Sequence, residues 1–252
     1  MAKLTTIVNY LNRALRISDF KDVSNNGLQV ENSGRVNRIC CGVDASQAFF
    51  DEANKRNADL LICHHGISWG DSLKHLTDLN YHRVASLIKN DMALYAAHLP
   101  LDAHPRHGNN AVLFKALGLQ DRKPFGNYHG NTIGFRGRFS SPMPVERFKM
   151  RVQKVCGQAL QTMEFGKQTI RTVAIVSGGG SDMLPEAAAA GVDAYLSGEP
   201  TLPAYHMAQE YGMHVIYAGH YATEVFGVRA LADALSKRFK IQAEFIPMNV
   251  PF

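Results

Sequence analysis

Two adjacent histidines, His64 and His65, end an apolar run in the segment DLLICHHGIS (59–68). Further along the chain, the segments YAAHLPLD (95–102) and YAGHYATE (217–224) each place a histidine four residues before a carboxylate. Neutral imidazole together with carboxylate suits Zn, Fe, Mn or Ni, whereas Ca and Mg prefer shells made of oxygen alone. These residue types therefore predict a transition-metal site.

The predicted ligands come from three separate segments and are five in number. One ion rarely uses five such ligands and still leaves room for chemistry, whereas two ions that share a bridging carboxylate use them readily. We therefore predict a dinuclear centre of two divalent transition-metal ions. The predicted ligands are His64, His65, Asp102, His220 and Glu224.

Other residues near these ligands have more than one possible role, or a role apart from coordination. His98 aligns with His220, but a sixth ligand is not required, so coordination, support of a ligand and contact with substrate all stay open. Gly66 is expected to free the backbone so that both preceding rings turn toward one crevice. Trp69 could stack a base there. The run Gly178–Gly180 favours a tight turn over an anion site, because no complete phosphate-binding motif surrounds it. The remaining histidines are expected to be ordinary solvated residues: His75, His82, His104, His107, His129, His206 and His214.

The elements that must position these residues follow an alternating pattern. RICCGVDAS (38–46) and DLLIC (59–63) read as buried strands, and the helical period of Phe49, Phe50 and Ala53 lies between them. Short apolar strands separated by helices continue through most of the chain. This pattern predicts the α/β class, with mainly parallel sheets flanked by helices.

The two halves of the chain repeat one design. A shift of 134 residues places Ile39 on Val173, Asp59 on Asp193, and the pair of histidines on Gly198 and Glu199. A shift of 122 places His98 on His220. We therefore expect two similar α/β domains that arose by internal duplication. A stretch rich in Gly, Pro and polar residues at 121–144 indicates a boundary. The expected domains are 1–123 plus 220–252, and 124–219.

Composition is typical of a soluble globular protein and does not identify a binding partner. Lys and Arg number 27 against 22 acidic residues, a net charge of +5 that permits an anionic partner but forms no basic block. The four cysteines lack metal-type spacing, so reduced core cysteines are expected. No apolar run reaches eighteen residues, and no signal-peptide pattern opens the chain. We expect a soluble cytoplasmic protein without membrane contact.

These segments resemble one known family, the GTP cyclohydrolase 1 type 2 homologs, or NIF-three-like proteins, in its short bacterial form. The resemblance implies intertwined α/β domains, a toroidal hexamer and a two-metal centre whose ligands map onto the five residues predicted above. The family name reflects a GTP ring-opening activity. The matching segments, in order, are SNNGLQVE (24–31), CGVDAS (41–46), ICHHG (62–66), HLPLDAH (98–104), GNN (108–110), SGGG (177–180), DAYLSGE (193–199) and AGHYATE (218–224).

Three functions are compatible with this sequence. The first is a metal-dependent hydrolase acting on a nucleotide or a related small anionic molecule, in which Glu224 bridges the ions and His98 moves a proton. The second is a toroidal nucleic-acid-associated protein, active in DNA damage response or repair, whose metal is partly structural. The third is a metal-handling or scaffold protein without catalysis. We rank them in this order.

Overall fold

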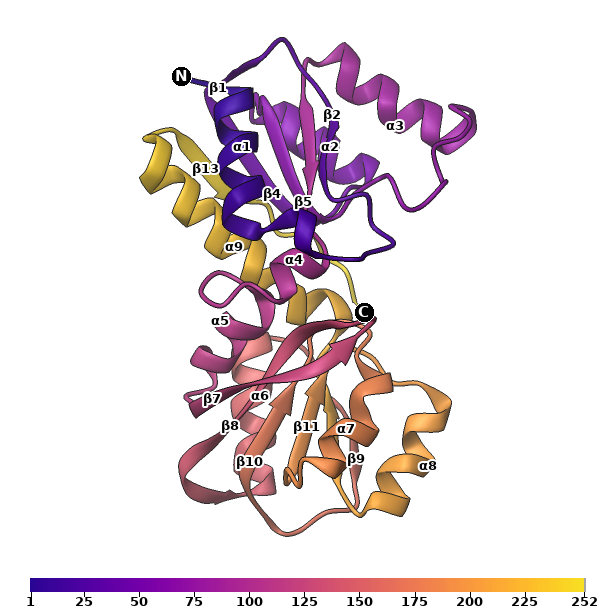
Figure 1. The fold of residues 1–252 in the computed structure, drawn as a ribbon, viewed down its shortest axis with the longest axis vertical. Helices are drawn as coiled ribbons and strands as arrows, with labels where there is room; N and C mark the ends of the chain where they lie inside the picture. The colour runs from indigo at the N-terminus through magenta and orange to yellow at the C-terminus, as the bar shows by residue number, and fades with distance from the viewer. Residues whose placement is uncertain (252) are drawn as a thin grey trace. The chain divides into compact units, whose positions relative to one another are not determined.

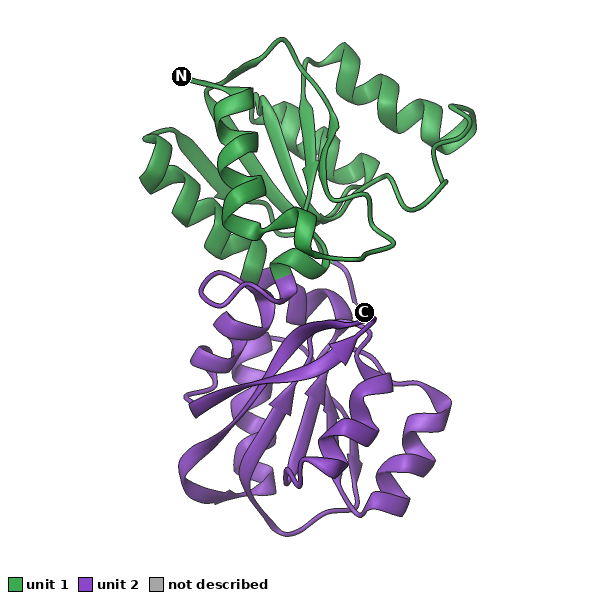
Figure 2. Ribbon diagram, viewed as in Figure 1, with its two compact units in different colours: residues 1–101, 227–249 green, residues 102–226, 250–252 purple. Residues whose placement is uncertain are grey.

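The computed structural model describes residues 1–251, which form two compact units (Figure 2). Unit 1 consists of Met1–Leu101 and Gly227–Asn249, and unit 2 consists of Asp102–Phe226 with the residues from Val250 on. The units divide the chain at other positions than the predicted domains. Residues 102–123 belong to unit 2 because Leu113, Phe114 and Leu117 pack in its hydrophobic core, which the composition change at 121–144 does not reveal.

Unit 1 is built on a five-stranded sheet of order β13-β4-β5-β6-β2, in which only β2 runs antiparallel to its neighbour (Figure 1). Its elements are β1 (Ala2–Lys3), α1 (Leu4–Leu15), η1 (Ile17–Asp19), β2 (Gly27–Val30), β3 (Arg35–Val36), β4 (Arg38–Asp44), α2 (Gln47–Lys55), β5 (Leu60–His65), α3 (Asp78–Lys89), β6 (Ala93–Ala96), α4 (Leu99–Asp102), most of α9 (His220–Phe239) and β13 (Gln242–Phe245).

Helices cover both faces of this sheet, as the buried strands require. On one face Phe49 and Phe50 of α2 and Leu87 of α3 pack on Leu61 and Leu94 of the strands. On the other face lies α1, where Ile7, Leu11 and Leu15 recur at helical spacing and are buried. Three of the cysteines, Cys40, Cys41 and Cys63, are free and buried in β4 and β5, as expected.

Unit 2 is built on a six-stranded sheet of order β7-β8-β10-β11-β12-β9. Only the pairs β10–β11 and β11–β12 are parallel, so this sheet is mixed rather than mainly parallel. Its elements are α5 (Asn109–Ala116), β7 (Gln120–Tyr128), β8 (Asn131–Pro144), α6 (Val145–Cys156), β9 (Gln161–Glu164), β10 (Thr169–Ile175), η2 (Ser181–Met183), α7 (Leu184–Ala189), β11 (Ala194–Ser197), α8 (Leu202–Tyr211), β12 (His214–Tyr217) and the start of α9.

The two units share the predicted duplication, and equivalent residues make equivalent strand pairs and hydrogen bonds. Both units contain three adjacent parallel strands joined by helices, and the pairs Ile39–Leu60 and Val173–Ala194 have the same register after the shift of 134. In each unit one aspartate lies directly before the second of these strands and is hydrogen-bonded to the backbone in or next to the first. Asp59 accepts hydrogen bonds from two successive backbone amides, at 2.6 and 2.9 Å, and Asp193 does so at 3.0 and 2.9 Å. The fold is α/β and duplicated, as the sequence predicts.

Replacing Asp193 by alanine is expected to lower the free energy of unfolding by about 1–3 kcal/mol, because two backbone amides and the Thr172 hydroxyl lose their acceptor. Burial alone would raise the pKa of Asp193, but the hydrogen bonds from Thr172 and Arg171 outweigh it and lower that pKa. The stabilisation is therefore fully present above the pKa of the unfolded carboxyl, about 3.9, and it is lost progressively as the pH falls from there through the lower pKa of the folded protein. Urea unfolding of both proteins at pH 7 and pH 3 measures it.

The exposed Asp182 provides the control, since Asp182→Ala removes a carboxyl of the same unit from a position open to solvent. A loss at Asp193 of equal size at pH 7 and pH 3 would contradict the role of its charge.

Candidate metal sites

The two histidines that end β5 are both part of the strand. His64 is fully buried, His65 is half-buried, and their ring centroids are 4.6 Å apart. Gly66 was expected to free the backbone, but it does not have a positive φ, the conformation that favours glycine. Instead, a Cβ atom at this position would clash with the side chain of Gln29 and with Ala96. Gly66 is therefore needed for space and not for backbone freedom.

His98 joins these two histidines in unit 1. It follows β6, the strand beside β5, and the ligand atoms of His64, His65 and His98 all lie within 4.8 Å of one another. The three residues form a group that could hold a metal ion. Of the roles left open for His98, coordination is thus compatible with its position.

An oxygen atom fixes the orientation of each imidazole in this group. The Nδ1 of His64 lies 2.9 Å from the Ala97 carbonyl oxygen, which can only accept, so Nδ1 carries the proton. The Nδ1 of His65 lies 2.7 Å from a carboxylate oxygen of Asp44, and the Nδ1 of His98 lies 2.9 Å from one of Asp22. A neutral ring that donates from Nδ1 presents the lone pair of Nε2, the form that binds metals.

Asp22 and Asp44 are functional candidates that sequence reasoning missed. The Asp22 side chain is only 2% exposed, and it also accepts hydrogen bonds from the Asn26 side chain and the Leu99 amide. Burial would raise the pKa of Asp22, but the hydrogen bond and charge of His98 outweigh it, and that pKa falls to about 2. Asp22 is therefore an ionised acceptor that holds the His98 ring in place.

Trp69 lies at the edge of the same group. Its ring centroid is 5.0 Å from that of His98 and 5.8 Å from that of His65. The indole Nε1 donates to the Gly66 carbonyl at 2.8 Å, which fixes the ring. An aromatic face is thus held beside the histidines, in agreement with the position predicted for it.

Unit 2 contains the other three predicted ligands. Asp102 ends α4 and is buried, and its Oδ1 accepts from Asn109 Nδ2 at 2.9 Å and from Ser177 Oγ at 3.0 Å. His220 and Glu224 lie one turn apart at the start of α9, with 3.2 Å between His220 Nε2 and Glu224 Oε1. Carboxylate oxygens of Asp102 and Glu224 lie within 4.8 Å of each other. Glu224 therefore lies close to each of the other two predicted ligands of unit 2.

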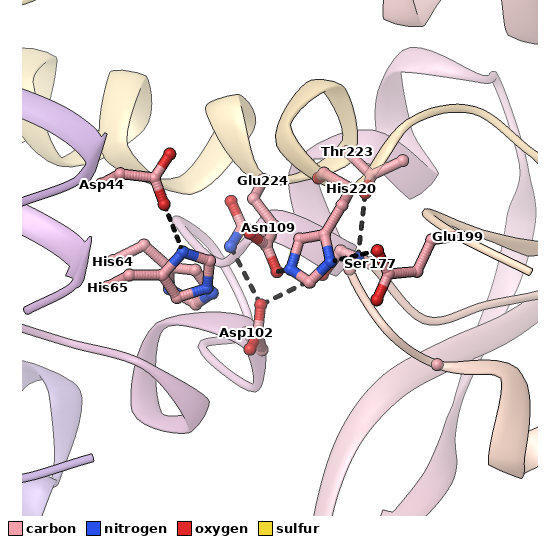
Figure 3. Close-up of polar contacts among 12 residues, drawn as sticks. Asp44, His64, His65, Asp102, Asn109, Ser177, Glu199, His220, Thr223 and Glu224 are labelled. Carbon is pink, nitrogen blue, oxygen red and sulfur yellow. Dashed lines mark hydrogen bonds and ion pairs between the residues drawn. The ribbon is translucent and has the colours of Figure 1, made fainter. Parts of the chain in front are cut away.

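The charges of this group favour a cation. Figure 3 shows the His220 ring between Glu224 and Glu199, whose Oε2 lies 3.1 Å from His220 Nδ1. Burial alone disfavours the imidazolium, but the hydrogen bond and charge of Glu224, with Glu199 behind it, raise the pKa of His220 to about 9. A metal ion on Nε2 would replace this proton. Two buried carboxylates this close together repel each other unless positive charge lies beside them.

The glycine run before η2 forms a tight turn, as predicted, and it shapes this site. Gly178 has a φ of +65°, its amide donates to Thr223 Oγ1 at 2.9 Å, and its carbonyl accepts from the Gly198 amide at 2.8 Å. A Cβ atom on Gly178 would collide with Glu224 Oε1. The absence of a side chain at position 178 therefore makes room for the Glu224 carboxylate.

The other histidines lie outside these groups. Most are exposed or half-buried, but His214 is buried in β12, and its Nε2 lies 2.7 Å from the Lys167 carbonyl oxygen. The expectation of a solvated residue was wrong there, because a single histidine at a strand position gives no signal of burial. Among the described residues, none of the helices is both long enough and apolar enough to cross a membrane.

Fold and side-chain groups together define a duplicated α/β protein with buried His, Asp and Glu groups that could bind metal. Residues 2–251 match the family described as Duf34/NIF3 (NGG1p interacting factor 3). The chain belongs to the DUF34/NIF3 family.

Relatives and solved structures agree with this assignment over nearly the whole chain. The GTP cyclohydrolase 1 type 2 homolog of Deinococcus radiodurans is 43% identical over 95% of this chain and 91% of its own length. The homolog of Pseudomonas aeruginosa is 40% identical over 98% of each chain. The structure of TTHA1606 from Thermus thermophilus is 37% identical with a TM-score of 0.91, covering 99% of this chain and 100% of that one. Reduced HcgD from Methanocaldococcus jannaschii is 26% identical with a TM-score of 0.85, covering 98% of each.

Proposed function

We propose that this protein is a metal-dependent hydrolase that acts on a nucleotide or a related small anionic molecule. In this proposal two divalent transition-metal ions are held by His64, His65, Asp102, His220 and Glu224. The observation that carries it is that the proposed ligands are already oriented. Each of the three histidines donates Nδ1–H to an oxygen, and both carboxylates are buried. Such orientation by a second layer of acceptors is typical of metal-binding histidines.

In this proposal the metal ions, His98 and Trp69 have different roles. Ions held by the proposed ligands would activate water for attack and polarise the bond that is cleaved. In this proposal His98 takes up and returns a proton through Nε2, because the hydrogen bond from its Nδ1 to Asp22 holds the ring in one orientation. Trp69 provides a flat aromatic face beside His98, on which a nucleobase could stack.

The relatives support the choice of substrate class. Their name, GTP cyclohydrolase 1 type 2 homolog, likens them to an enzyme that acts on GTP. A nucleotide is therefore the first substrate to test on this chain.

Turnover of a panel of nucleotides and phosphoesters by metal-loaded protein tests the proposal. We expect the wild-type chain to release product and Glu224→Gln to lose at least about 100-fold in kcat/KM, since a buried charged group beside the reaction is removed. Glu210→Gln, an exposed position on α8, is the matched control and should keep full activity. His98→Gln should lower kcat while bound metal is retained if His98 acts on a proton. A metal-loaded wild-type protein that turns over no member of the panel would contradict the proposal.

The hexameric ring and the nucleic-acid-associated function stay predictions from the sequence. Sedimentation equilibrium of the purified chain measures the subunit number. Binding of DNA or RNA with an affinity that falls steeply with salt would favour the nucleic-acid function.

A further inference from the structure

Unit 2 contains a cavity that is separate from the side-chain groups described above. Its volume is about 550 Å³, within the range of small-molecule sites. None of the residues that line it belongs to the candidate metal groups. The lining residues are Asp121, Arg122, Lys123, Arg136, Gly137, Arg138, Thr172, Ala190 and Val192.

Strand alternation places two of the basic side chains on one face of the sheet. Phe135 and Phe139 of β8 belong to the hydrophobic core that α5 and α6 cover. Because successive side chains of a strand point to opposite faces, Arg136 and Arg138 point away from this core. The long hairpin of β7 and β8 that carries them is visible in Figure 1.

The cavity has a strong excess of positive charge. Four of its lining side chains are basic and one, Asp121, is acidic. Asp121 is already paired with Arg138. Among residues 1–251, the side chains of Lys123 and Arg136 form no ion pair or hydrogen bond. Arg136 is also half-buried.

The register of the β7–β8 pair adds charge repulsion between two of the basic side chains. Lys123 of β7 lies directly opposite Arg136 of β8. Like charges directly opposite each other destabilise an antiparallel pair. A β-bulge between Gln120 and Lys123 sets this register, and the bulged residue Asp121 has a left-handed φ of +54°. Bulges often re-aim side chains next to functional sites.

We propose that this cavity binds a small phosphorylated molecule. Guanidinium groups match the oxygens of a phosphate with paired hydrogen bonds, and a lysine adds a further charge. The small apolar side chains of Ala190 and Val192 form a wall against which the organic part of such a ligand can lie. A bound phosphate also removes the repulsion between Lys123 and Arg136, so the sheet gains stability on binding.

Calorimetric titration with inorganic pyrophosphate at low ionic strength tests the proposal. We expect saturable binding by the wild-type chain and about tenfold weaker binding by Arg136→Gln and by Lys123→Gln. Arg147→Gln removes an equal charge from an exposed position on α6 and should bind as the wild type does. Lys123→Gln should leave the melting temperature of the ligand-free protein unchanged or higher, because a like-charge pair is lost, so weaker binding cannot be ascribed to unfolding.

Glu224→Gln separates this site from the candidate metal groups, since pyrophosphate also binds metal ions. We expect Glu224→Gln to keep pyrophosphate binding. Binding that is lost in Glu224→Gln but retained in Arg136→Gln would overturn the proposal, as would equal weakening by Arg147→Gln. A chain that ignores pyrophosphate but binds single-stranded DNA through Arg136 would also overturn it, in favour of a nucleic-acid surface.

Discussion

Replacement of Glu224 by glutamine is expected to reduce the transition metal bound per subunit to about half or less, because a neutral amide is a poor substitute for a carboxylate ligand. Glu224 is buried, and its carboxylate lies 3.2 Å from His220 and within 4.8 Å of Asp102. Glutamine has nearly the same size and shape as glutamate, so the substitution removes the negative charge and little else. Metal analysis of freshly purified protein by mass spectrometry measures the effect.

Thermal unfolding gives an independent measure of the same change. A chelator should lower the melting temperature of the wild-type chain, because ligands that bind only the folded state stabilise it. In Glu224→Gln the chelator should have a much smaller effect, while Glu210→Gln should respond as the wild type does. Equal metal content in all three proteins would refute the role proposed for Glu224.

Gly178→Ala is expected to lower the free energy of unfolding by about 3 kcal/mol or more and to abolish metal binding by unit 2. Two costs add up here. Alanine at a φ of +65° costs about 1–2 kcal/mol, and its Cβ atom forces the Glu224 carboxylate out of position. Denaturant unfolding and metal analysis of the same preparation measure both effects.

Gly191 offers a closely matched control for this substitution. It has a φ of +64°, but a Cβ atom there would have nothing within 4 Å. Gly191→Ala should therefore show the backbone cost alone, about 1–2 kcal/mol, and should retain bound metal. If the two variants were equally stable and bound equal metal, the steric role of Gly178 would be excluded.

The sequence predicts those parts of the fold in which apolar residues follow a clear period. The helical spacing of Val145, Phe148 and Val152 predicts a helix over about 144–157, and the structure has α6 at Val145–Cys156. By contrast, β2 and β9 were not predicted. Both are antiparallel edge strands that are at least partly exposed, so neither has the continuous apolar run that marks a strand buried on both faces.

The candidate site, too, could be predicted only in part from the sequence. The histidines and carboxylates were found from their types and their repetition, and the structure brings His64 and His65 together in one unit and Asp102, His220 and Glu224 together in the other. Their role as ligands stays a prediction. Asp22 was missed because it lies 76 residues from His98 and has no counterpart in the repeat. Glu199 carried a signal, since the shift of 134 aligns it with His65.

The interrupted chain path of unit 1 has a consequence for synthesis on the ribosome. Unit 2 is nearly continuous, so it can fold once residue 226 has emerged. The edge of β4 is covered only when β13 (Gln242–Phe245), about 200 residues further along the chain, has been synthesised and pairs with it. Until then the nascent amino-terminal half exposes an open sheet edge, and such edges are prone to aggregation.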